Sequence, residues 1–340
     1  MPAEPAEPAE PAEVRGAAAV PRPAGPTDPA RSGPTAIPGG PSGRSAAAGG
    51  RPAGLPYQVV ATDLDGTLLR GDLTVSLRTR QALKLATGAG ALHLVVTGRP
   101  ASSCRRFLLE LGYSGLAVCG QGAQLYDAAT DRLLSSAALH RDPARALVAA
   151  VERELGRLEL GVVNAAPENR CVSTAGFFGA PPPGSETVTD RAALWAAPLE
   201  KVLMRHPELP DAAVVATATR LAGGAMTVVH SQRGMVELLP AGISKATGLA
   251  AAAERLGFTA AGTVAFGDMP NDLPMLAWAG HGVAMANAHP DLLAAADETA
   301  PASNDADGVA MVLERLFAVE GDGTAAGTGT RDLPERRAGR

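Results

Sequence analysis

The sequence contains few aromatic residues, few cysteines and no long apolar run. Aromatic residues make up 3% of the 340 residues, which disfavours a binding pocket built on ring stacking. The three cysteines, Cys104, Cys119 and Cys171, are odd in number and widely spaced, so they indicate neither a disulfide framework nor a thiolate metal site. Apolar runs stay below the roughly 18 residues that span a bilayer, and no secretory signal pattern is present. We therefore expect a cytoplasmic protein without a membrane partner.

The sequence also lacks an excess of basic charge. Its 30 Lys and Arg residues stand against 35 Asp and Glu residues, which gives a net charge of -5. Such a chain has no basic field to attract nucleic acid or an anionic membrane surface. The hydrophobic content of 46% is enough to fill the cores of two domains. Neither composition nor charge indicates an oligomeric state, which stays unassigned.

Residues 1–55 and 319–340 differ in composition from the rest of the sequence. The first segment consists largely of Pro, Ala, Gly and Glu, and the last is rich in Gly, Thr and Arg. Segments of this kind bury too little apolar surface to offset the entropy of ordering the chain. We predict that both are disordered tails on either side of a folded region over residues 56–318.

Short apolar runs alternate with helical patterns at both ends of the folded region. Ser76 is a candidate N-cap for a helix over Leu77–Thr87, and Ser244 is one for a helix that reaches Leu256. The alternation of strands and helices predicts a parallel sheet with right-handed crossovers. The predicted strands are Tyr57–Thr62, Leu92–Thr97, Leu116–Cys119, Thr263–Gly267 and Gly282–Met285, and the other predicted helices are Ala101–Leu111, Asn271–Ala279 and Gly308–Phe317.

The stretch from residue 124 to residue 239 has a different pattern. Two apolar runs, Ala225–His230 and Met235–Leu239, are typical of a β-hairpin, and a Pro-rich turn at Pro181–Pro183 and two long helical patterns accompany them. The first sheet is thus interrupted by an insertion. We predict an α/β fold in which residues 56–123 and 240–318 form a Rossmann-like parallel sheet core and residues 124–239 form an inserted α+β domain.

The strongest chemical signal is the motif Asp63-Leu64-Asp65-Gly66-Thr67, directly after the first predicted strand. Reactive groups collect at the carboxyl edge of open parallel sheets, so two carboxylates there suit a nucleophile beside an acid/base. An EF-hand calcium loop starting at Asp63 would need Gly at its sixth position and Glu at its twelfth, where Leu68 and Thr74 stand. An ordinary polar turn is the remaining alternative for this motif alone.

A second acidic motif, Gly267-Asp268-Met269-Pro270-Asn271-Asp272, follows a later predicted strand. Helix capping explains Asn271 and Asp272 by themselves, but it does not explain Asp268. Together with Asp63 and Asp65, this motif gathers four carboxylates at one crevice, where they would repel one another without a cation. An all-oxygen site of this kind suits Mg²⁺ rather than Zn²⁺.

Two further residues give weaker signals. Thr97 ends the second predicted strand, in Val96-Thr97-Gly98-Arg99, and Lys245 follows the candidate cap Ser244. A strand-end Thr is usually structural, and a Lys early in a helix is usually a solvated surface charge. A Lys in the first helical turn is unfavourable against the helix dipole, however, which indicates an anion nearby.

Taken in order, these motifs resemble those of the haloacid dehalogenase-like hydrolases, specifically the Cof-type phosphatases with a type IIB cap. The resemblance covers most of residues 57–318, with the inserted domain as the cap and Glu200–Leu203 as a cap strand. Each motif is moderately specific, whereas the ordered set is highly specific. The matching segments are Thr62–Leu69, Val96–Arg99, Gly242–Lys245, Phe266–Asp272, Val283–Ala288 and Ser303–Ala310.

The resemblance implies a Mg²⁺-dependent phosphatase that acts on a small phosphorylated metabolite. It makes Asp63 the nucleophile that forms an aspartyl-phosphate and Asp65 the general acid/base, with Thr97 and Lys245 completing the catalytic set. The residues that it implies for the metal are Asp63, Asp65 through its backbone carbonyl, Asp268 and Asp272. The residues that it implies for the substrate are Gly66, Thr97, Gly98, Lys245 and Asn271.

The sequence departs from the family pattern after the third predicted strand, where Gln121-Gly122-Ala123 replaces the usual Asn-Gly-Ala. Two alternatives remain open: a phosphomutase of the phosphomannomutase type, and a non-catalytic module that binds a phosphorylated ligand. Sugar phosphates, a flavin mononucleotide or pyridoxal phosphate would all fit the motifs. We predict that the segment from residue 165 to residue 184 sets specificity, with Arg170, Thr174 and Phe177 as candidates.

Overall fold

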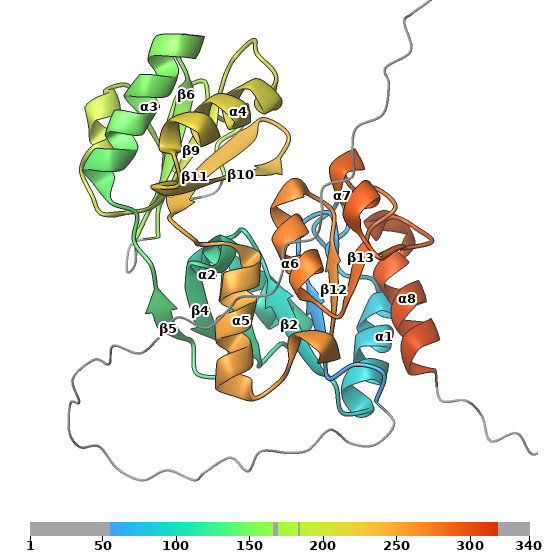
Figure 1. Cartoon of the computed structure of the whole chain (residues 1–340). Helices are drawn as coiled ribbons and strands as arrows, with labels where there is room; N and C mark the ends of the chain where they lie inside the picture. The colour runs from blue at the N-terminus through green and yellow to red at the C-terminus, as the bar shows by residue number, and fades with distance from the viewer. Residues whose placement is uncertain (1–54, 166–168, 183, 319–340) are drawn as a thin grey trace, which may run out of the picture. The chain divides into compact units, whose positions relative to one another are not determined.

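The computed structural model describes residues 55–165, 169–182 and 184–318, which form two β-sheets and the helices packed on them (Figure 1). The predicted tails lie outside the described residues, except for Leu55. Within the described ranges, no helix has both the length and the apolar character needed to cross a membrane.

The first sheet has eight strands in the order β14-β13-β12-β1-β2-β3-β4-β5. The strands from β14 to β3 pair in parallel, and β4 and β5 continue the sheet in antiparallel pairs. Because β1 lies between β12 and β2, the residues that follow these three strands meet at one edge. The strands are β1 Val59–Thr62, β2 Leu92–Val96, β3 Leu116–Cys119, β4 Gln124–Asp127, β5 Arg132–Ser136, β12 Thr263–Gly267, β13 His281–Ala284 and β14 Glu298–Thr299.

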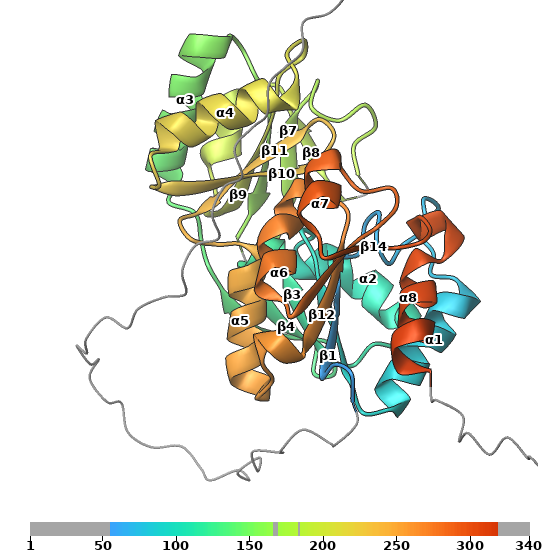
Figure 2. The same ribbon diagram turned by 45° about the vertical axis from the view of Figure 1, so that its right-hand side comes forward.

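Helices cover both faces of this sheet (Figure 2). Successive side chains of a strand point to opposite faces, so Val60 packs in the core under one set of helices while Val59 and Ala61 pack under the other. The first set is α1 Leu77–Gly88, α2 Ala101–Leu111 and α8 Gly308–Phe317. The second set is α5 Lys245–Leu256, α6 Leu273–Trp278 and α7 Pro290–Ala295.

Helix α5 begins with a capping box. The Ser244 hydroxyl accepts a hydrogen bond from the Thr247 backbone N–H, and the Thr247 hydroxyl accepts one from the Ser244 backbone N–H. This cap places Lys245 at the first position of α5. The helix predicted from Asn271 instead starts as a 3₁₀ turn over Pro270–Asp272 and becomes α-helical at Leu273, because Pro274 lacks a backbone N–H and must lie in the first turn.

The second sheet has six strands in the order β10-β11-β9-β6-β7-β8. Helices α3 and α4 cover one face, where Val151 and Val214 pack against strand residues such as Val202. The predicted hairpin is present as the antiparallel pair β10 and β11. The elements are α3 Arg141–Leu155, β6 Glu159–Asn164, β7 Cys171–Thr174, β8 Glu186–Val188, β9 Leu199–Arg205, α4 Asp211–Ala222, β10 Met226–Gln232 and β11 Met235–Pro240.

The two sheets confirm the predicted fold class, a largely parallel α/β core with a separate inserted sheet. The predicted boundary at residue 124 falls at the start of β4, which hydrogen-bonds to β3 of the first sheet. The insertion's own sheet therefore spans residues 159–240, and the exact domain boundaries stay a prediction.

Candidate active site

Three buried carboxylates gather at the carboxyl edge of the first sheet. Asp63 follows β1, Asp268 follows β12, and Asp272 ends the 3₁₀ turn after Asp268. One carboxylate oxygen from each lies within 4.8 Å of the others. Three negative groups at this spacing repel one another unless cations lie among them.

Lys245 supplies one positive charge to this cluster. Its Nζ lies 2.8 Å from Oδ1 of Asp63 and 2.6 Å from Oδ1 of Asp272, and its side chain is 1% exposed. Burial by itself lowers the pKa of Lys245, but the carboxylates of Asp272 and Asp63 outweigh it and raise that pKa above its usual value. Lys245 therefore keeps its positive charge. The anion expected near a Lys in the first turn of this helix corresponds to the carboxylates of Asp63 and Asp272.

The protein groups by themselves do not fully compensate the carboxylates. Burial raises the pKa of Asp63 well above its usual range despite Lys245, and the neighbouring Asp272 and Asp268 raise it further. Burial and Asp272 likewise raise the pKa of Asp268 to about 7. Lys245 by itself therefore does not balance the charge of the three carboxylates.

The donor atoms fit a hard divalent cation. All are oxygens, and the cluster combines Asp63 and Asp268 with a third carboxylate, Asp272, whose Oδ2 already accepts hydrogen bonds from the backbone N–H groups of Asp268 and Met269. Oδ1 of Asn271 is buried and has no hydrogen-bond partner within the described part of the chain. A cation with oxygen ligands would supply the charge that this cluster lacks.

The loop after β1 is shaped around Asp268. Gly66 has a φ of 74°, a conformation that favours glycine, and Thr67 donates a hydrogen bond of 2.9 Å from its Oγ1 to Oδ1 of Asp268. The carbonyl of Gly66 accepts a hydrogen bond from Asn287. The loop therefore holds Asp268 at a fixed place beside Asp63.

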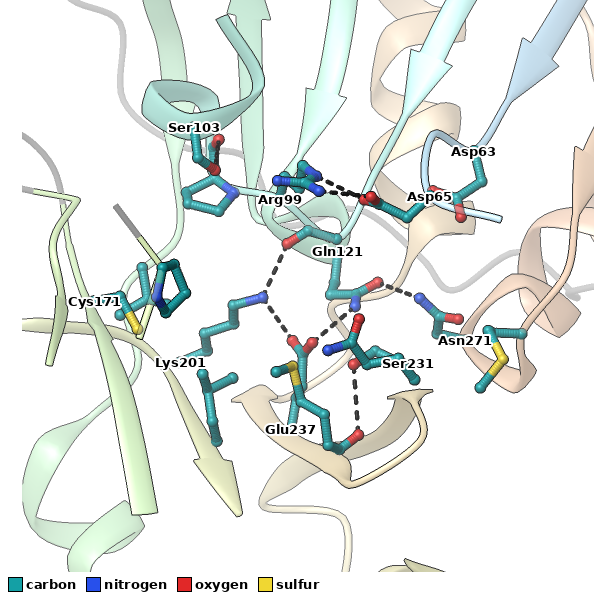
Figure 3. Close-up of a pocket in the computed structure, with 18 of the residues that line it drawn as sticks. Asp63, Asp65, Arg99, Ser103, Gln121, Cys171, Lys201, Ser231, Glu237 and Asn271 are labelled. Atoms are coloured by element: carbon teal, nitrogen blue, oxygen red, sulfur yellow. Dashed lines mark hydrogen bonds and ion pairs between the residues drawn. The ribbon is translucent and has the colours of Figure 1, made fainter. Parts of the chain in front are cut away.

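Asp65 points to a different partner. The Arg99 guanidinium donates two hydrogen bonds to it, from Nε to Oδ2 at 2.7 Å and from Nη2 to Oδ1 at 2.6 Å (Figure 3). This bidentate pair orients the Asp65 carboxylate at the edge of the cavity. Arg99 belongs to the segment Val96–Arg99, but no role was predicted for it, because its partner Asp65 is evident only in three dimensions.

Thr97 and Gly98 lie at the end of β2, on the same sheet edge. Thr97 is fully buried, and its hydroxyl accepts a hydrogen bond from the Arg99 backbone N–H at 3.1 Å. The carbonyl of Gly98 accepts a hydrogen bond of 2.9 Å from Nζ of Lys201 in β9. All the predicted site residues thus lie at the ends of β1, β2 and β12 or at the start of α5.

A buried chain of polar groups joins the second sheet to this edge (Figure 3). Lys201 forms an ion pair of 2.7 Å with Glu237 of β11, and Glu237 accepts a hydrogen bond of 3.2 Å from Gln121. Gln121, at a φ of 61°, in turn accepts a hydrogen bond of 2.9 Å from Nδ2 of Asn271. Lys201 and Glu237 were not predicted as site residues, although a charge inside an otherwise apolar strand is a usable signal.

A cavity of about 480 Å³ lies between the carboxylate edge and the second sheet. Asp63, Asp65, Asp268 and Asn271 line one side of it, whereas Thr97, Lys245 and Asp272 are buried behind that surface. From the segment predicted to set specificity, Cys171, Phe178, Pro182 and Gly184 line the cavity. The three candidates named there do not: Thr174 and Phe177 are buried, and Arg170 pairs with Glu186.

Comparisons with known proteins agree with this arrangement. A family model described as haloacid dehalogenase-like hydrolase matches residues 60–313. The 5-amino-6-(5-phospho-D-ribitylamino)uracil phosphatase YcsE of Bacillus subtilis is 27% identical over 257 residues, covering 75% of this chain and 94% of the relative. The pyridoxal phosphate phosphatase YbhA of Escherichia coli is 27% identical over 266 residues, covering 75% of this chain and 97% of the relative.

A solved structure shares the fold. The crystal structure of a haloacid dehalogenase-like hydrolase from Bacteroides thetaiotaomicron has a TM-score of 0.60 and 26% identity, covering 77% of this chain and 100% of the other.

Proposed function

The chain belongs to the haloacid dehalogenase-like hydrolases, as its motifs suggested, and we propose that it is a Mg²⁺-dependent phosphatase that hydrolyses a small phosphorylated metabolite through an aspartyl-phosphate on Asp63. The family makes it a phosphoric monoester hydrolase. The observation that carries the mechanism is the buried Lys245, held between Asp63 and Asp272 beside Asp268. Asp63 thus lines the cavity directly beside the positive charge of Lys245.

Asp63 and Asp268 are the residues that would hold Mg²⁺, together with the backbone carbonyl of Asp65. Asp272 would support them, because it anchors both Lys245 and the backbone N–H of Asp268. When bound, Mg²⁺ supplies positive charge to the phosphoryl oxygens and to the carboxylate that attacks them.

In the first half-reaction an oxygen of Asp63 attacks phosphorus, and the bond from phosphorus to the leaving oxygen breaks. Lys245 and the hydroxyl of Thr97 stabilise the charge on the transferring phosphoryl oxygens. The phosphoryl group is then bound covalently to Asp63, which divides one difficult displacement into two easier ones.

Asp65 moves the protons in both half-reactions. In its acid form it donates a proton to the leaving alkoxide, and as a carboxylate it then takes a proton from the water that attacks the aspartyl-phosphate. The bond from phosphorus to the Asp63 oxygen breaks in that second step, which releases phosphate and regenerates the Asp63 carboxylate. The two hydrogen bonds from Arg99 hold the Asp65 carboxylate at the edge of the cavity, where the leaving group and the attacking water would lie.

The relatives support a small phosphorylated metabolite as the substrate. One acts on a ribitylaminouracil phosphate and the other on pyridoxal phosphate, as their names state. The mutase alternative would retain Asp63 and Asp65 but return the phosphoryl group to the sugar. The binding-module alternative has no support from a site that keeps both carboxylates, Lys245 and Asp268.

Phosphate release from p-nitrophenyl phosphate tests the proposal. We expect release with Mg²⁺, none with EDTA, and a loss of at least about 1,000-fold in Asp63→Asn. Asp142→Asn, an exposed Asp on α3, is the matched control and should retain full activity. Glucose 1-phosphate separates the mutase, because an isomerised sugar phosphate in place of free phosphate would favour that alternative.

A further inference from the structure

The face of the second sheet that points into the cavity carries a wall of apolar side chains. Val163, Phe177 and Leu203 form a small buried cluster, and Cys171, Phe178 and Met235 pack against it, partly exposed. This cluster is separate from the core under α3 and α4, because alternate residues of each strand face opposite ways. All of its members except Phe177 line the cavity.

The charged side chains on this side of the cavity are already paired. Lys201 contacts Glu237 and the carbonyl of Gly98, and Glu237 also accepts a hydrogen bond from Gln121. Among the described residues that line the cavity, the other basic side chain is Arg99, which holds Asp65. A second anionic group on a substrate would therefore meet no unpaired cation among these lining residues.

The volume adds a limit on size. A cavity of about 480 Å³ has to hold the phosphoryl group and the leaving group together. Partly exposed apolar side chains inside a cavity gain free energy when a ligand covers them. The leaving group that fits best is compact, uncharged and apolar.

Building on the proposed function, we propose that the substrate is a phosphomonoester of a compact, uncharged alcohol whose apolar ring or chain packs on the wall formed by Val163, Cys171, Phe178, Leu203 and Met235. The phosphoryl group lies at Asp63, and the alcohol points toward β9 and β11, whose Leu203 and Met235 line the cavity. Bisphosphates are poor substrates because their second phosphoryl group meets no unpaired cation among the lining residues, and polyol phosphates are poorer than apolar esters because hydroxyl groups packed on this wall would lose hydration.

Three phosphomonoesters test this assignment: benzyl phosphate, glucose 6-phosphate and glucose 1,6-bisphosphate. Benzyl phosphate and glucose 6-phosphate both release a primary alcohol, so leaving-group reactivity is comparable. We expect kcat/KM for benzyl phosphate to exceed that for glucose 6-phosphate by about tenfold or more, with the bisphosphate lowest. An equal or reversed order overturns the assignment.

Two test variants, each with a control, probe the apolar wall and the lack of an unpaired cation among the lining residues. Met235→Gln should lower the ratio of kcat/KM for benzyl phosphate to kcat/KM for glucose 6-phosphate about tenfold, whereas Met235→Leu should keep that ratio. Gln232→Lys, at an exposed lining position, should raise kcat/KM for the bisphosphate about tenfold. Gln81→Lys adds the same charge at an exposed position of α1 and should leave kcat/KM for the bisphosphate unchanged. Unchanged ratios in Met235→Gln and Gln232→Lys overturn the assignment.

Hydrolysis of p-nitrophenyl phosphate, measured in parallel, distinguishes a failure of the substrate assignment from a failure of the proposed function. Hydrolysis of that ester without a preference for benzyl phosphate refutes the apolar leaving group and leaves the phosphatase standing. No phosphate from any of the four esters refutes the proposed function, and the substrate assignment falls with it.

Discussion

A Cβ atom at residue 66 would lie 2.2 Å from Oδ2 of Asp268. No side chain can occupy that position unless Asp268 moves, and the φ of 74° at Gly66 is strained for any other residue. The glycine after Asp65 thus leaves room for the carboxylate that follows β12, so two motifs that are distant in the sequence fit together at one contact.

Replacement of Gly66 should therefore weaken the metal site. We expect Gly66→Ala to lower Mg²⁺ affinity at least about tenfold, because Asp268 is displaced from Asp63. Gly88→Ala is the control, since a Cβ at residue 88 meets nothing within 4 Å. Isothermal titration calorimetry with Mg²⁺ measures both variants, and equal affinities would show that Asp268 is not a metal ligand.

The buried pair of Lys201 and Glu237 should be strongly coupled in stability. Removal of one partner leaves the other charge buried, so Lys201→Met and Glu237→Leu should each cost about 3 kcal/mol, and the double variant should cost clearly less than their sum. The exposed pair of Arg78 and Glu314 provides the control cycle, with an expected coupling below about 1 kcal/mol. Urea unfolding measures the unfolding free energies for both double-mutant cycles. Equal coupling energies for the two pairs would contradict the burial of Lys201 and Glu237.

Glu200, next to Lys201 on β9, should make stability depend on pH. Burial raises its pKa from 4.5 to about 7, and its Oε2 accepts a hydrogen bond of 2.6 Å from Gln124. The folded state therefore binds this proton more tightly than the unfolded chain does. The resulting stability is complete below the unfolded pKa and is lost as the pH rises through about 7, by up to roughly 3 kcal/mol.

The comparison of wild type with Glu200→Gln isolates this effect. We expect the unfolding free energy of the variant to rise relative to that of the wild type between about pH 4.5 and pH 7. Glu110→Gln, at an exposed position on α2, should show no such trend. A difference curve for Glu200→Gln that is flat across this range would rule out the raised pKa.

Local patterns were enough to predict the sheet and the carboxylate edge. The strands that precede Asp63, Thr97 and Asp268 are short apolar runs, and their parallel order follows from the helices between them. Ser244 identified the start of α5 and so placed Lys245. Asp63, Asp268 and Lys245 could be predicted because their positions are set by elements next to them in the sequence.

Contacts between the insertion and the edge could not be predicted in the same way. Lys201 and Glu237 are charges inside largely apolar strands, but the strand pattern does not reveal which groups they contact, because Gly98 and Gln121 are distant in the sequence. The positive φ of Gln121 and the partner of Arg99 depend on long-range packing. For the same reason the strand β4 could not be assigned to the first sheet rather than to the insertion.

The most direct test of the mechanism is to trap the phosphoryl group on Asp63. In Asp65→Asn the water attack is slowed, while p-nitrophenolate leaves without a proton, so the intermediate should accumulate during a single turnover with Mg²⁺. Acid quenching and peptide mass spectrometry should then find one phosphoryl group on Asp63, and none in Asp63→Asn. A phosphoryl group on another residue, or phosphate formed at the wild-type rate with no phosphorylated protein, would contradict Asp63 as the nucleophile.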